Sequence, residues 1–126
     1  MHHHSIRRAA VAHTVRCARE ILAGGGQVTV DATSTTTRKR ATWLGLAREH
    51  GVAARAVVVD TPLPVCLARN AARPPRRRVP AEVVRRMWGA VHDLTDTALT
   101  AEGFVHINRP ADAERGYAAD CVRHRR

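Results

Sequence analysis

Apolar residues in the first part of the chain recur with the spacing of a helix. They lie three or four positions apart within residues 9–23, which places them on one face of an α-helix. Three consecutive glycines at positions 24–26 follow the pattern, and glycine is typical of the position after a helix end. We therefore predict a helix over residues 9–23. Its apolar positions are Val11, Val15, Ala18 and Leu22.

The next stretch consists of a short β-branched run and a polar loop. Residues 27–31, Gln-Val-Thr-Val-Asp, have the composition of a buried strand. The Ser/Thr-rich residues 33–37 would form a loop at its carboxyl end. A helix is expected over residues 38–50, because Gly51 follows as the residue type common after a helix.

The same order of elements is repeated in the second half of the chain. Residues 56–60, Ala-Val-Val-Val-Asp, predict a second strand, and residues 63–73 predict the helix that follows it. A long helix is expected from Pro80 up to Gly103, and residues 104–107 predict a third strand. The apolar positions of the long helix are Val84, Met87, Trp88, Val91, Leu94 and Leu99.

Three short apolar strands separated by helices indicate a parallel sheet. Such strands are joined by right-handed crossovers, so we expect a doubly wound α/β fold. Ligands of these sheets bind beyond the carboxyl ends of the strands, where the pattern places Asp31 and Asp60. The residues after Asn108 are expected to add at most one weak helix.

The composition limits how well this fold can be stabilised. The chain has 126 residues, which suits one domain, but 22 of them are alanine and only 3% are aromatic. Alanine buries little apolar surface, so we expect a thin core that a ligand or partner would stabilise. No recognisable membrane span or secretory signal occurs, which favours a cytoplasmic location. The three cysteines have no paired spacing and are expected to be small core residues: Cys17, Cys66 and Cys121.

The positive charge is carried almost entirely by arginine. There are 21 Lys+Arg against 11 Asp+Glu, a formal net charge of +10, and Lys39 is the only lysine. Guanidinium groups present rigid forks of donors that suit phosphate oxygens, which favours phosphorylated partners. A general background charge in an Arg/Ala-rich chain explains the excess equally well, so the charge by itself names no partner.

The first candidate site lies where the predicted strand 27–31 meets its loop. Asp31 would stand at the ligand edge of the sheet, with the hydroxyls of Thr33 and Ser34 close behind it in the sequence. Such a carboxylate can hold Mg²⁺ or one of its waters, because Mg²⁺ prefers oxygen ligands and keeps part of its hydration shell. The alternative is that Asp31 caps the following loop or helix.

The second candidate site is an arginine-rich segment. Arg69 and Arg73 are four residues apart, so on a helix they would share one face and could grip one anionic group. Two prolines, at positions 74 and 75, would stop that helix, and the arginines at 76–78 continue as a loop before the next helix. This order is typical of a lid that closes over a polyphosphate. The alternative is an exposed basic turn.

Taken in order, these segments resemble the kinase domain of polynucleotide kinases. The resemblance begins with Asp-Ala-Thr-Ser at 31–34 and an arginine at 38 or 40. It continues through Val-Val-Asp-Thr-Pro-Leu at 58–63 and Val-Cys-Leu-Ala-Arg-Asn at 65–70 to Arg73 and the Val-Pro pair before residue 81. The matching core spans residues 27–107. This family is a branch of the P-loop kinases, often described as AAA-type ATP-binding proteins, and is more distantly related to zeta toxins.

The resemblance implies a three-layer, P-loop kinase-like parallel sheet that uses ATP and Mg²⁺. Asp31 is implied as the metal-side carboxylate, acting directly or through a water molecule. Arg69 and Arg73 are implied as the arginines that bind the donor phosphates, and residues 74–80 as the basic lid loop.

The acceptor side of the site is implied in the same way. Thr33 and Ser34 fall on the family's acceptor motif, although Ser34 stands where the family usually has Asn. Arg38 is implied as a contact to the acceptor phosphate.

Two parts of the family's site have no counterpart in these residues. The phosphate loop G-x-x-x-x-G-K-[ST] surrounds the β- and γ-phosphates with backbone N–H groups and a lysine. Here Lys39 follows Arg38 rather than Gly. No Asp or Glu precedes Glu20, so the general-base Asp is missing and no catalytic residue is identifiable. We expect residues 1–126 to form a single partial kinase-like domain without the first strand and phosphate loop.

Several functions remain open at this point. In the family, the absent strand lies between the strands that end at Asp31 and Asp60. Three arrangements are therefore open: the two strands pair directly with each other, another chain supplies the strand between them, or the chain is a fragment. The leading interpretation is a kinase-like domain for transfer from ATP to a hydroxyl such as a nucleic-acid 5′-OH, nearly inactive in this form. The alternatives are a non-catalytic nucleic-acid or nucleotide-binding module that uses residues 76–78, and a structural half whose partner chain carries the phosphate loop.

Overall fold

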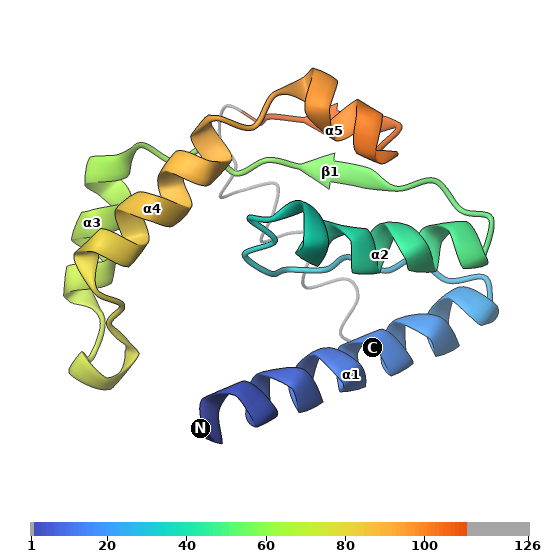
Figure 1. Ribbon diagram of the computed structural model, residues 1–126, viewed down its shortest axis with the longest axis horizontal. Coiled ribbons are helices and arrows are strands. Elements are labelled where there is room, and N and C mark those ends of the chain that lie inside the picture. Colours follow the sequence, from blue (N-terminus) through green and yellow to red (C-terminus); the bar gives the residue numbers. More distant parts are fainter. Residues whose placement is uncertain (1, 111–126) are drawn as a thin grey trace.

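Helices dominate the part of the chain that the computed structural model describes, residues 2–110 (Figure 1). The predicted terminal helix and Cys121 lie outside these residues. No helix in the described part is both long and apolar enough to cross a membrane. In chain order the elements are α1 (His2–Ala23), α2 (Thr37–Glu49), β1 (Arg55–Val57), α3 (Leu63–Ala72), the 3₁₀ helix η1 (Pro75–Arg77), α4 (Ala81–His92), α5 (Asp96–Glu102) and β2 (His106–Asn108).

The sheet consists of two parallel strands, β1 and β2, with Ala56 opposite Ile107. The N–H of Val58 donates to the carbonyl of Asn108 at 2.8 Å, which extends the ladder by one bond. The helices between the strands, α3, η1, α4 and α5, supply the long connection that parallel pairing needs. The second and third predicted strands are therefore confirmed in order and direction, although each is only three residues long.

The first predicted strand, residues 27–31, does not form. Within residues 2–110, no backbone hydrogen bond joins this segment to either strand. A strand is stable only when its N–H and C=O groups meet those of a neighbour, and β-branched composition cannot supply that neighbour. The prediction was wrong for this segment, and the described residues form a helix-rich α/β fold with a parallel sheet of two strands rather than three. Direct pairing of residues 27–31 with β1 does not occur.

The predicted helices are largely confirmed. α2 and α3 each lie within one residue of their expected bounds at both ends. Thr36 caps α2, because its hydroxyl accepts a hydrogen bond from the N–H of Lys39 at 3.2 Å. α1 begins at His2, earlier than the expected residue 9.

The long helix expected from Pro80 to Gly103 is instead two helices, α4 and α5. The break lies at residues 93–95, and Thr95 starts α5 because its hydroxyl accepts from the N–H of Ala98 at 3.1 Å. The Arg109 guanidinium donates to the carbonyl of Leu94 at 2.6 Å, which gives one carbonyl freed by the break a partner. Apolar residues occur on both sides of the break, at Leu94 and Leu99, so the helix was expected to run through it.

The core is thin, as the composition predicts. Leu99 is the only large side chain with less than 2% exposure among the described residues. Cys17 and Cys66 are only partly buried, so they are not full core residues. The buried apolar residues of the described part are Ala18, Leu44, Leu46, Ala47, Val58 and Leu99.

α1 packs against α2 through its C-terminal half (Figure 1). Ala18 is buried there, and Arg19 donates to both carboxylate oxygens of Glu49 at 3.2 and 3.3 Å. These hydrogen bonds lower the pKa of the Glu49 carboxyl below its ordinary value of 4.5. The carboxylate is therefore charged at neutral pH and holds the ion pair.

Candidate functional site

The segment before α2 carries the predicted metal and acceptor residues. Asp31 and Thr33 are exposed, and Arg38 is exposed in the first turn of α2. Ser34 is partly buried and has a φ of 38°, a left-handed conformation that is uncommon for a residue with a side chain. The segment therefore makes a tight turn directly before the helix.

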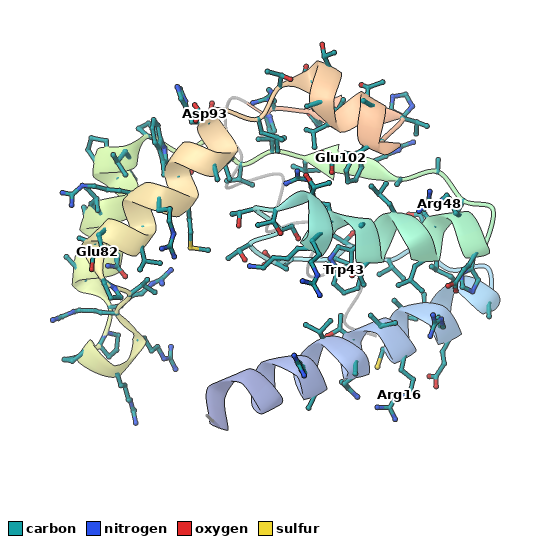
Figure 2. The ribbon with its side chains drawn as sticks, in the orientation of Figure 1. Arg16, Trp43, Arg48, Glu82, Asp93 and Glu102 are labelled. Atoms are coloured by element: carbon teal, nitrogen blue, oxygen red, sulfur yellow. The ribbon has the colours of Figure 1, made fainter. Side chains whose placement is uncertain are left out.

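Arg40, one of the two arginines that the acceptor motif allowed, is buried and structural. Its guanidinium forms a two-point ion pair with Glu102, with Nε–Oε1 2.8 Å and Nη2–Oε2 3.0 Å. A third nitrogen, Nη1, donates to the carbonyl of Ser34 at 3.0 Å. Figure 2 shows Glu102 in the region between α5 and α2. Arg40 therefore joins the turn at Ser34 to the end of α5, and Arg38 remains the arginine available to a ligand.

Glu102 was not recognised from the sequence. It lies 62 positions from Arg40, inside a stretch that periodicity assigned to a continuous helix. A lone glutamate near a helix end carries no local signal of a distant partner.

The arginine-rich segment forms the hairpin α3–η1–α4. Asn70 is buried and joins the two sides of the loop, since its Nδ2 donates to the Val79 carbonyl at 2.6 Å and its Oδ1 accepts from the Val79 N–H at 3.0 Å. Arg78 Nε donates to the Arg73 carbonyl at 2.8 Å and so caps the end of α3. The predicted basic loop is a hydrogen-bonded turn rather than an open segment.

Arg69 and Arg73 are exposed at the loop end of this hairpin, next to η1. Arg69 lies in the last turn of α3, whereas Arg73 is the residue that follows the helix, with φ −69° and ψ 153°. The expected shared helical face is therefore wrong for Arg73, because the chain turns extended before two prolines that cannot continue a helix. Both side chains are still exposed and lie only four residues apart in the chain.

The hairpin is anchored to the carboxyl end of β1. The indole Nε1 of Trp88 donates to the carbonyl of Thr61 at 2.9 Å. The Cys66 thiol donates to the same carbonyl with a sulfur–oxygen distance of 3.6 Å. Trp88 also stacks on the ring of His92, with centroids 4.5 Å apart. Trp88, expected only as an apolar helix residue, thus positions the hairpin.

The two candidate sites lie toward the same side of the molecule. Figure 1 shows the segment before α2 turning at the end of that helix that faces α3 and α4, which is also the side to which β1 points. This agrees with the rule that ligands bind beyond the carboxyl ends of parallel strands. A cavity of about 140 Å³ lies elsewhere, next to Ala54 and Gly103 at the amino end of β1.

A metal ion would have only one predicted protein ligand here. Among the side chains that the structure describes, those of residues 8–110, no group of three or more His, Cys, Asp or Glu could hold an ion. Asp31 alone suits Mg²⁺ that is bound mainly through substrate phosphates and water, which is how proteins commonly bind this ion. A single carboxylate, Asp31, therefore suits Mg²⁺ that binds as a complex with a nucleotide.

Comparison with protein families decides the wider assignment. A family model described as an AAA domain matches residues 3–96, which is 94 of the 126 residues. The chain belongs to this AAA-domain family. The match covers α1 to α4 and therefore includes both candidate sites. A search of curated proteins gave no match.

Membership of the AAA-domain family makes this a P-loop NTPase-like chain, and it supports the nucleotide-binding, kinase-like part of the sequence interpretation. The roles of the individual residues stay predictions, as does the boundary of the partial domain at residues 1–126.

Proposed function

We propose that the chain is the nucleotide-binding part of a kinase-like AAA domain of the polynucleotide-kinase type. In the complete domain, the γ-phosphoryl group of ATP would pass to a hydroxyl, such as the 5′-OH of a nucleic acid. The observation that supports this most is the arginine hairpin, which Trp88 fixes at the carboxyl end of β1 in a chain of the AAA-domain family.

The residues divide the work of phosphoryl transfer, which consists mostly of positioning and charge neutralisation. Arg69 and Arg73 bind the donor phosphates, because a guanidinium forms charge-assisted hydrogen bonds to phosphate oxygens. Asp31 holds Mg²⁺, which would screen the charge on the phosphates. Thr33, Ser34 and Arg38 line the acceptor side in this proposal.

An additional strand completes the site in this proposal. β1 pairs with β2 along one edge, and residues 27–31 pair with no strand of the described part. Val57 and Val59 are 48% and 42% exposed, although strands of parallel sheets are normally buried. In this proposal a strand that carries the phosphate loop, supplied by a separate polypeptide, lies between residues 27–31 and β1. Without it we expect the chain to transfer little phosphate.

The Arg73→Ala variant tests the donor side. Wild-type chain should bind Mg-ATP saturably in a calorimetric titration, and the variant should bind about tenfold more weakly, the effect of one hydrogen bond to a charged group. Arg85→Ala removes one exposed charge from α4 and should leave the affinity unchanged. Equal ATP affinity of wild type and Arg73→Ala, or no saturable binding by the wild type, would contradict the proposal.

Amide hydrogen exchange tests the added strand. In the chain alone, the amides of residues 28–31 should exchange as fast as those of an exposed loop, because no carbonyl of a described strand accepts a hydrogen bond from their N–H groups. Adding a polypeptide with the phosphate loop and its preceding strand from another AAA-domain protein should protect these amides and tighten Mg-ATP binding. Unchanged exchange at residues 28–31 at saturating partner concentration would rule the arrangement out.

A further inference from the structure

The tip of the hairpin carries arginines that the proposed nucleotide site does not use. Residues 69–86 contain seven arginines and one acidic residue, Glu82. Arg76 and Arg77 lie in η1 and are exposed, and within the described residues their guanidiniums make no hydrogen bond or ion pair. Figure 2 shows nitrogen-tipped side chains extending outward from the loop that joins α3 and α4. We call Arg76 and Arg77 the tip arginines.

The backbone beneath the tip arginines is fixed. The N–H of Arg77 donates to the Pro74 carbonyl at 2.8 Å, and the Asn70 side chain holds both backbone groups of Val79. Prolines at positions 74, 75 and 80 restrict the chain further. A rigid turn loses little conformational entropy when it binds a ligand. The tip is therefore a preorganised cationic surface.

The geometry of η1 indicates what kind of anion fits. A 3₁₀ helix has about three residues per turn, so consecutive side chains point roughly 120° apart. Arg76 and Arg77 therefore leave the backbone in different directions, which favours contacts to two phosphate groups over a shared contact to one. Divergent guanidiniums suit a polymer with repeated phosphates, because each one meets a different phosphate.

We propose that the tip arginines bind the sugar–phosphate backbone of duplex nucleic acid at a site separate from the ATP phosphates. Trp88 already bonds Thr61 and stacks on His92, so we assign it a structural role and base the proposal on phosphate contacts rather than on stacking with unpaired bases. Duplex DNA has the higher charge density along its axis and is bound more tightly than a single strand of equal length. Binding is independent of base sequence, since phosphates carry no sequence information.

Salt-dependent binding of a fluorescein-labelled DNA duplex tests this site, with Arg76→Ala/Arg77→Ala as the variant. Losing two phosphate contacts should reduce the slope of log K against log salt by about 1.8. The wild type should therefore lose roughly tenfold more affinity than the variant between about 50 and 200 mM salt. The variant's thermal midpoint should equal that of the wild type, because these side chains hold no other described residue.

The matched control is Arg8→Ala/Arg16→Ala, which removes two exposed charges from α1. Figure 2 shows Arg16 on the side of α1 that points away from the other elements. This control should keep the wild-type slope. Equal weakening by both double variants would show a general charge effect and overturn the proposal, and so would unchanged DNA binding of the tip variant. Tighter binding of phosphatidylserine vesicles than of DNA, lost in the tip variant, would also overturn it.

The same titrations separate this inference from the proposed function. Arg73→Ala should weaken Mg-ATP binding and keep most of the DNA affinity. The tip variant should weaken DNA binding and keep most of the Mg-ATP affinity. If ATP binding fails while the tip variant still loses DNA affinity, the nucleic-acid site stands without the kinase proposal.

Discussion

Arg40→Ala should lower the free energy of unfolding by about 3–5 kcal/mol, the usual cost of removing one partner from a buried ion pair. Arg40 is 7% exposed and the Glu102 side chain 14%. Without Arg40, the largely buried Glu102 carboxylate has lost its cation. The Ser34 carbonyl loses the donor that holds the turn before α2. Urea unfolding followed by circular dichroism measures the loss.

A double replacement separates the charge effect from the packing effect. In Arg40→Met/Glu102→Leu no charge remains unpaired, so most of the stability should return. Mg-ATP binding should not recover fully, since the turn at residues 31–34 has lost its anchor. A loss below about 1 kcal/mol for Arg40→Ala, the level of an exposed pair, would show that Arg40 does not hold the fold.

The helices were predictable because their signals are local. Apolar spacing, the cap at Thr36 and the glycine after α2 lie within a few residues of the features they define. The break between α4 and α5 was missed, because apolar residues on both sides of it were assigned to one helix. Thr95 caps α5 through a local bond from the N–H of Ala98, and the distant Arg109 separately bonds the carbonyl of Leu94.

The strands were predictable only in part, since a strand depends on its neighbour. Residues 27–31 and 56–60 have similar β-branched composition, yet only the second segment meets a partner, at Ile107. Local sequence gives the tendency to form a strand, whereas pairing is a property of the assembled sheet. The partner of Arg40 could not be predicted for the same reason, because Glu102 is distant in the sequence and meets Arg40 only in the folded chain.

The motif around Asn70 shows how a resemblance and a structure contribute differently. The order Arg-Asn-x-x-Arg at 69–73 implied phosphate binding by its two arginines. The structure gives the asparagine between them a separate task, since Asn70 holds the loop at Val79. The exposed arginines can be placed toward a ligand only because this buried residue fixes the turn. In the proposed function, phosphate binding by the hairpin therefore depends on Asn70, a residue that does not itself contact phosphate.

Asn70→Ala is the direct test of that dependence. The variant loses two hydrogen bonds to Val79 and leaves partly buried backbone groups without partners, so stability should fall by about 2–4 kcal/mol. Amides of residues 74–79 should exchange faster in hydrogen-exchange measurements. Affinity for Mg-ATP and for duplex DNA should fall together, because both sites on the hairpin lose their preorganised geometry.

Arg78→Ala provides the control on the same loop. It removes the bond from Arg78 to the Arg73 carbonyl, but the side chain is exposed and water replaces it. Its stability loss should stay below about 1 kcal/mol. If Asn70→Ala costs no more than Arg78→Ala and leaves exchange at residues 74–79 unchanged, the loop keeps its shape without Asn70. In that case the prolines, rather than the side-chain amide, would hold the arginines in place.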